Sequence, residues 1–119
     1  MIAQSHRFHG RNSLRYVYKN GQTTRGPLFA IKSMQNPQRQ TYRVAVIISR
    51  KIHKSAVTRN RLRRRLYESI RGLSEDIIRP YDIVLTVFSD KLIDESPKGL
   101  TRYVKKQLSE AGILAKRVS

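Results

Sequence analysis

Apolar residues recur every three or four positions in the stretch that begins at Val57. Leu62, Leu66, Ile70 and Leu73 follow one another at spacings of four, four and three. This spacing is the repeat of an amphipathic helix with 3.6 residues per turn. The other positions of this helix are polar over more than half of its circumference. The pattern predicts a long helix that buries one side and exposes the other.

Two shorter segments show the same repeat. The first, 14–20, is predicted to be a helix capped by Asn12 or Ser13 and ended by Gly21. The second is predicted to begin at Ser96-Pro97, because serine is a good cap and proline fits the first helical position. The apolar positions are Leu14, Val17 and Tyr18 in the first helix, and Leu100, Val104, Leu108 and Ala111 in the second, which closes near Gly112.

Three segments rich in β-branched and aromatic residues predict strands, at 28–34, 42–49 and 81–89. Segment 21–27, which precedes them, is rich in turn residues and predicts a loop. Asn36-Pro37 indicates a turn, so we expect the first two strands to form a hairpin. The continuous Val/Ile content of 42–49 predicts burial on both faces. The strands at 42–49 and 81–89 flank the long helix, which favours a crossover between parallel neighbours, right-handed by default. The element order indicates a compact α+β fold, an α/β sandwich.

Charge is concentrated in the first part of the chain. The 119 residues carry 25 Lys/Arg against 8 Asp/Glu, a net charge of +17. Residues 1–67 hold 16 of these bases and no acid. Such a charge indicates a polyanionic partner, with nucleic acid before an anionic membrane surface. The length fits a single domain over 1–119.

The densest basic segment is 50–71, which overlaps the long helix. It holds nine Lys/Arg and one acid, Glu68. The alternative is an ordinary solvent-exposed helix face whose charges form ion pairs with one another. Arg64 and Arg65 are spaced to pair with Glu68. One carboxylate cannot neutralise nine bases, so we interpret the segment as a binding surface.

Several classes of function are disfavoured by what the chain lacks. No apolar run approaches the ~20 residues that span a membrane, and residues 1–10 lack the hydrophobic core of a signal peptide. The absence of cysteine excludes disulfides and fits a reducing compartment, so we expect a cytoplasmic protein. Three scattered histidines give no zinc-binding spacing, so no metal site is expected in the protein.

The segment Ala56-Val57-Thr58-Arg59-Asn60-Arg61-Leu62-Arg63-Arg64, preceded by Ser49-Arg50-Lys51, resembles the signature of the bacterial ribonuclease P protein subunit. The resemblance covers about 7–112. It extends to Arg7-Phe8, to Leu14–Gly21, which is similar to a Phe-x-x-Val-Phe-Lys-x-Gly helix, and to Tyr81-Asp82-Ile83-Val84. Leu14 departs from the usual Phe, and Tyr67 stands where Arg is common.

This resemblance implies a four-stranded sheet with three helices and a left-handed crossover through the basic helix, against the right-handed default above. It implies a protein that binds a large catalytic RNA and helps it to remove the 5′ leader of precursor tRNA. The partners would be that RNA and precursor tRNA, with no membrane.

The candidate contacts to the catalytic RNA lie in the basic segment, where Arg offers a planar fork and Lys a point charge to phosphates. Asn60 either bonds RNA or caps backbone, and Arg59 lies close enough to the apolar stripe to bond locally instead. The candidates are Arg50, Lys51, Lys54, Arg59, Asn60, Arg61, Arg63, Arg64 and Arg65.

The resemblance also implies a cleft for the single-stranded leader, with Phe8, Tyr18 and Lys32 as candidates. Stacking on a base contributes ~1–3 kcal/mol. Core packing is the alternative role for Phe8 and Tyr18.

No catalytic side chains are expected in the protein, because its carboxylates form no paired motif and its histidines have no nucleophile partner. We expect Mg²⁺, bound mainly by the RNA, to activate the attacking water. Two other readings remain open from sequence: a non-enzymatic RNA-binding protein of ribosomal type, and a helix-turn-helix DNA binder that uses 57–71 for recognition.

Overall fold

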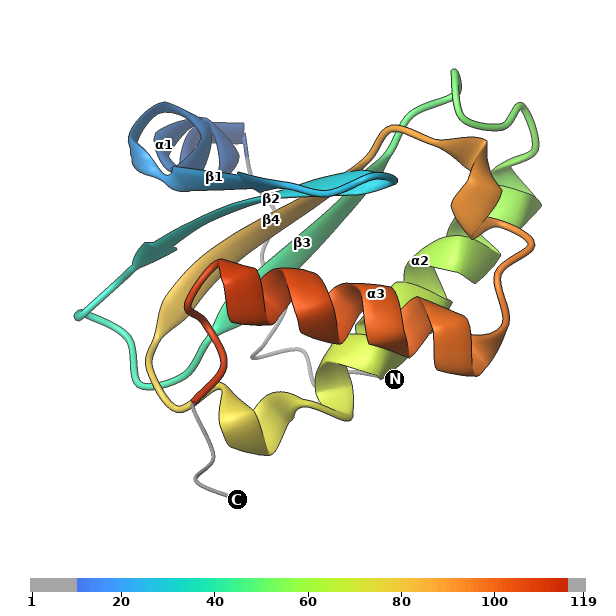
Figure 1. The fold of residues 1–119 in the computed structure, drawn as a ribbon. Coiled ribbons are helices and arrows are strands. Elements are labelled where there is room, and N and C mark those ends of the chain that lie inside the picture. The colour runs from blue at the N-terminus through green and yellow to red at the C-terminus, as the bar shows by residue number, and fades with distance from the viewer. Residues whose placement is uncertain (1–10, 116–119) are drawn as a thin grey trace.

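Three helices cover the two faces of a four-stranded sheet in the part of the chain that the structure, a computed structural model, describes, residues 11–115 (Figure 1). The α+β prediction is confirmed. The helices are α1 (Arg11–Asn20), α2 (Ala56–Arg71) and α3 (Pro97–Glu110); the strands are β1 (Gln22–Arg25), β2 (Phe29–Gln35), β3 (Arg43–Ile48) and β4 (Tyr81–Val87); and two short 3-10 helices are η2 (Ser74–Asp76) and η3 (Asp90–Leu92).

The strands lie in the order β1-β2-β4-β3. β2 pairs antiparallel with β1 and with β4, whereas β3 runs parallel to β4. The predicted crossover between parallel neighbours is confirmed, since α2 connects β3 to β4. The left hand of that crossover stays a prediction. A helix that joins two strands of one sheet is not part of a helix-turn-helix unit.

The predicted hairpin between 28–34 and 42–49 is wrong, because β4 lies between β2 and β3. The hairpin partner of β2 is β1, in a segment predicted to be a loop. The sequence of β1, QTTR, has no apolar alternation, and the strand is held by its pairing with β2 and by a turn in which Gly26 N–H donates to the Phe29 carbonyl at 3.0 Å.

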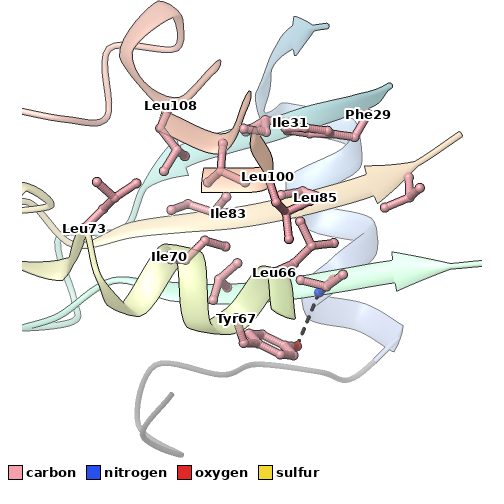
Figure 2. Packing of buried hydrophobic residues seen from close by; sticks show 14 of the residues in the cluster. Phe29, Ile31, Leu66, Tyr67, Ile70, Leu73, Ile83, Leu85, Leu100 and Leu108 are labelled. Carbon is pink, nitrogen blue, oxygen red and sulfur yellow. Dashed lines mark hydrogen bonds between the residues drawn. The ribbon is translucent and has the colours of Figure 1, made fainter. Parts of the chain in front are cut away.

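The main core lies between the sheet and the pair α2 and α3 (Figure 2). Leu62, Leu66 and Ile70 of α2 are buried, as is Leu73 just beyond the helix, so the predicted apolar stripe is confirmed. Burying each such side chain contributes about 1.5–3 kcal/mol. The helical repeat alone places Tyr67 on the polar side of α2, but this residue is 9% exposed and packs in the core.

The opposite face of the sheet carries α1. Val17 packs against Ala45 of β3 and Val84 of β4, so β3 and β4 are buried on both faces, as predicted for 42–49. The predicted cap is wrong, because α1 begins at Arg11 and contains both Asn12 and Ser13. The helix ends at Gly21 as predicted, where a Cβ would lie 2.5 Å from the Val17 carbonyl oxygen.

α3 begins and ends as the sequence predicts. The Ser96 hydroxyl accepts a hydrogen bond from Gly99 N–H at 3.0 Å, Pro97 is the first helical residue, and Gly112 has a φ of +75° just past the end. The Gln107 side chain, 3% exposed, donates to the carbonyls of Thr24 and Phe29 and so holds the β1–β2 hairpin against α3. Within residues 11–115, no helix is long and apolar enough to cross a membrane.

Candidate nucleic-acid interface

The basic segment begins in the loop between β3 and α2. The Ser55 hydroxyl accepts a hydrogen bond from Thr58 N–H at 3.2 Å and so caps α2. Ser55 N–H in turn donates to His53 Nδ1 at 3.0 Å. This cap, which we did not predict, is recognisable in sequence as a serine one residue before the first helical position. It fixes the point at which the loop becomes a helix.

Three cations of this loop are exposed to solvent: Arg50, Lys51 and Lys54. On α2, Asn60, Arg61 and Arg64 are also exposed. Arg61 and Arg64 have no ion-pair partner among residues 11–115. We call the exposed cations of the loop and of the first turns of α2 the cationic face: Arg50, Lys51, Lys54, Arg61 and Arg64.

Glu68, the acid of the basic segment, does not neutralise the cationic face. Its carboxylate pairs with Arg71 at 2.9 Å, one turn further along α2. The spacing also allowed pairs with Arg64 or Arg65, but the structure places the ion pair at the far end of the helix. The first turns of α2 therefore keep their charge.

Two of the predicted contacts are partly engaged within the protein. Arg63 donates from Nε to the Val46 carbonyl at 3.4 Å and from Nη1 to Asn60 Oδ1 at 2.6 Å. Arg65 donates from Nη1 to the Ile93 carbonyl at 3.1 Å and from Nη2 to the Glu95 carbonyl. Both arginines are half-buried. These hydrogen bonds hold α2 against its neighbours. Contacts of Arg63 and Arg65 to RNA stay a prediction, and only the remaining N–H groups of the two side chains are available for them.

Arg59 and Asn60 each keep polar side-chain groups that make no hydrogen bond among the described residues. Arg59 is half-buried, and its side chain has no hydrogen bond among the described residues, so it does not bond locally as we considered. The Asn60 amide oxygen accepts from Arg63, which leaves its amide nitrogen for another partner.

The second predicted surface lies on the sheet face that carries α1. Tyr18 is 39% exposed, and its hydroxyl lies 2.7 Å from Thr86 Oγ1 of β4. Lys32 of β2 donates from Nζ to the Tyr18 carbonyl at 2.9 Å. The structure thus brings Tyr18 and Lys32 together, as the leader prediction requires. Phe8, the third candidate, lies outside the described residues.

An aromatic residue that we did not predict lies one position after β4. Phe88 is 37% exposed, and the Arg25 guanidinium lies 4.6 Å from the centroid of its ring. The pair joins the ends of β1 and β4, which are distant in sequence. The sequence gives no signal for this contact. Arg25 lies in a segment predicted to be a loop, so the pairing that brings it near Phe88 could not be predicted.

A model of the Ribonuclease P family matches residues 2–112. The chain belongs to the ribonuclease P protein family. A ribonuclease P protein component of Synechococcus elongatus is 29% identical over 116 residues, which cover 95% of both chains. Another, from Macrococcus caseolyticus, is 33% identical over 84 residues, which cover 71% of this chain and 72% of the relative.

Solved structures of the ribonuclease P protein share the fold. A Staphylococcus aureus RNase P protein mutant with defective mRNA degradation activity superposes with a TM-score of 0.84 at 19% identity, covering 93% of this chain and 92% of that one. The RNase P protein from Thermotoga maritima gives a TM-score of 0.77 at 21% identity, with 87% and 96% covered. Family membership makes the chain a protein component of a ribonucleoprotein, ribonuclease P, which acts in tRNA processing. Family membership also argues against the two alternative hypotheses, an RNA-binding protein of ribosomal type and a helix-turn-helix DNA binder.

Proposed function

We propose that the chain holds the catalytic RNA of ribonuclease P on the cationic face of α2 and the preceding loop. The observation that carries this proposal is the pair Arg61 and Arg64, which are exposed without an acid partner among residues 11–115 on a helix whose opposite side is buried in the core. Because the apolar side fixes the helix, the charges have a defined direction. Arginine forks suit phosphate oxygens.

The second part of the proposal is that the 5′ leader of precursor tRNA lies on the sheet face that carries α1, beside Tyr18 and Lys32. An exposed aromatic ring and a nearby ammonium group are the elements that bind single-stranded RNA without reading its sequence. Each side chain is held in place by its own hydrogen bond, the Tyr18 hydroxyl by Thr86 and the Lys32 ammonium group by the Tyr18 carbonyl. Phe88 under Arg25 is a further stacking surface of the same kind.

The chemistry in this proposal belongs to the RNA. Mg²⁺ would be bound mainly by RNA phosphates, whose oxygens are the ligands that this ion prefers. Among residues 11–115 no group of three or more His, Cys, Asp or Glu side chains is placed to hold a metal ion. The protein contributes charge and position, and it meets its RNA partners in the cytoplasm.

Reconstitution with the catalytic RNA tests this function. The protein is added to the RNA and a precursor tRNA at low Mg²⁺, and the rate of leader removal is measured. Stimulation by the wild-type protein, reduced by Arg61→Ala and Arg64→Ala together, is expected. The absence of any stimulation by wild type would refute the proposal. Lys105→Ala, an exposed charge removed from α3, is the matched control.

A further inference from the structure

A cavity of about 460 Å³ lies on the sheet face that carries α1, beside the predicted leader surface. Its walls come from α1, from the end of β2 with the turn that follows, and from the first residues of β3 and β4. On β4, Asp82 lines this cavity and Thr86 contacts Tyr18. Val84, which packs under α1, lies between them. The cavity and the leader surface are thus separated by α1.

The floor of the cavity carries an ion pair between the half-buried Arg43 and the buried Asp82. Arg43 donates from Nε to Asp82 Oδ1 and from Nη2 to Asp82 Oδ2, both at 2.8 Å. Asn36 donates to Asp82 Oδ2 at 3.0 Å. Hydrogen bonding to Asp82 raises the pKa of Arg43 above its usual value. Because the two charges neutralise each other, the floor suits neither a phosphate nor a cation.

The rim of the cavity carries polar groups that the fold does not use. The Tyr16 side chain is 60% exposed, and its hydroxyl has no partner among the described residues. The amide of Gln38, which both donates and accepts, is likewise unpaired within residues 11–115, and Ser13 offers a hydroxyl. The Asn36 side chain accepts from Gln38 N–H at 3.2 Å and so holds the turn in place.

We propose that this cavity binds one unpaired nucleobase of RNA, stacked on Tyr16 and read along its edge by the Gln38 amide. Its volume falls within the ~300–1,000 Å³ of small-molecule sites. An aromatic ring for the base face, uncharged donors and acceptors for the base edge, and a neutral floor match a nucleobase better than any other part of RNA. The inference rests on the proposed function and adds a base-specific contact to it.

The base has two possible sources, the leader of precursor tRNA and the catalytic RNA. The test measures two affinities: that of the protein for catalytic RNA, and that of the assembled complex for precursor tRNA compared with mature tRNA. The variants are Tyr16→Ala, Tyr16→Phe and Gln38→Ala. Gln40→Ala is the control, because Gln40 is an exposed glutamine of the same loop that does not line the cavity.

Tyr16→Ala is expected to weaken one of the two affinities at least about fivefold, whereas Tyr16→Phe retains the ring and most of the affinity. Gln38→Ala should change the preference among the four bases at one RNA position, and Gln40→Ala should not. A weaker affinity seen only with leader-bearing tRNA assigns the base to the leader. A weaker affinity seen with catalytic RNA alone assigns it to that RNA.

Unchanged affinities for Tyr16→Ala and Gln38→Ala, with Arg61→Ala and Arg64→Ala still weakening RNA binding, would overturn the cavity assignment and leave the proposed function intact. Wild-type protein that neither binds nor stimulates the RNA would overturn both. Unchanged thermal unfolding of each variant shows that a weaker affinity does not come from a disrupted fold.

Discussion

The backbone N–H of Val46 donates a hydrogen bond to the phenolic oxygen of Tyr67 at 3.3 Å. Val46 lies in β3, an edge strand, and its carbonyl accepts from Arg63 Nε of the same helix. Two side chains of α2 thus satisfy backbone groups of β3 that no neighbouring strand reaches. The edge is covered, as edges of stable sheets usually are, and α2 is fixed by polar bonds as well as by its apolar side (Figure 2).

Tyr67→Phe is expected to lower the free energy of unfolding by about 0.5–1.5 kcal/mol, because the Val46 N–H loses its partner. Urea unfolding measures this change. Tyr103→Phe is the matched control, since no hydrogen bond of its hydroxyl exists within residues 11–115. Equal effects of the two substitutions would show that the Tyr67 bond does not contribute to stability.

Ser55→Ala should destabilise the protein by about 0.5–2 kcal/mol, the usual effect of removing a helix cap. The Thr58 N–H would lose its acceptor, and the junction between loop and helix would loosen. Thermal unfolding and the helical signal in circular dichroism measure the change. Ser55→Asp, which restores a capping oxygen, should recover most of the stability; if it does not, capping is not the role of Ser55.

Arg65→Ala and Arg64→Ala should differ in their effect on stability. Arg65 holds the carbonyls of Ile93 and Glu95, next to the start of α3, so its removal should cost about 1–3 kcal/mol. Arg64 is exposed and makes no such bond among residues 11–115, so its removal should leave unfolding within about 0.5 kcal/mol of wild type. Denaturant unfolding of both variants compares the two, and the reverse order would contradict this division of roles.

Lys32→Met should weaken binding of precursor tRNA to the assembled complex and leave mature tRNA unaffected. The substitution removes the ammonium group beside Tyr18 and keeps an apolar stem of similar length. Titration with tRNAs of different leader lengths measures the effect, with Lys98→Met on α3 as the control. A decrease that is equal with and without a leader would place Lys32 outside the leader surface.

The strongly periodic segments were predictable from sequence. The apolar stripe of α2, the Ser96-Pro97 start of α3 and the buried strands β3 and β4 depend on local patterns that the fold preserves. Strand order was not predictable in the same way. β1 is polar and exists through its pairing with β2, and β4 separates β2 from β3 although it follows both of them in the chain.

The charge of the candidate interface was predictable from sequence, but the contacts that its side chains make within the protein were less so. The positions of Arg61 and Arg64 follow from the helical repeat. The hydrogen bonds of Arg63 and Arg65 do not follow from it. Their acceptors are carbonyls on β3 and on the segment before α3, and every residue type supplies such a carbonyl, so the sequence does not indicate them. Tyr67 was missed for the same reason: its partner is a backbone N–H of an edge strand.

The central claim is that the cationic face of α2 contacts RNA phosphates while the rest of the helix holds the fold. The most direct test is the dependence of log affinity for the catalytic RNA on log salt concentration, for wild type and for the double variant Arg61→Ala, Arg64→Ala. Removing one phosphate-binding arginine should reduce the slope by ~0.7–0.9, so removing both should reduce it by about 1.4–1.8, with unfolding unchanged. An unchanged slope in a folded double variant would contradict the claim.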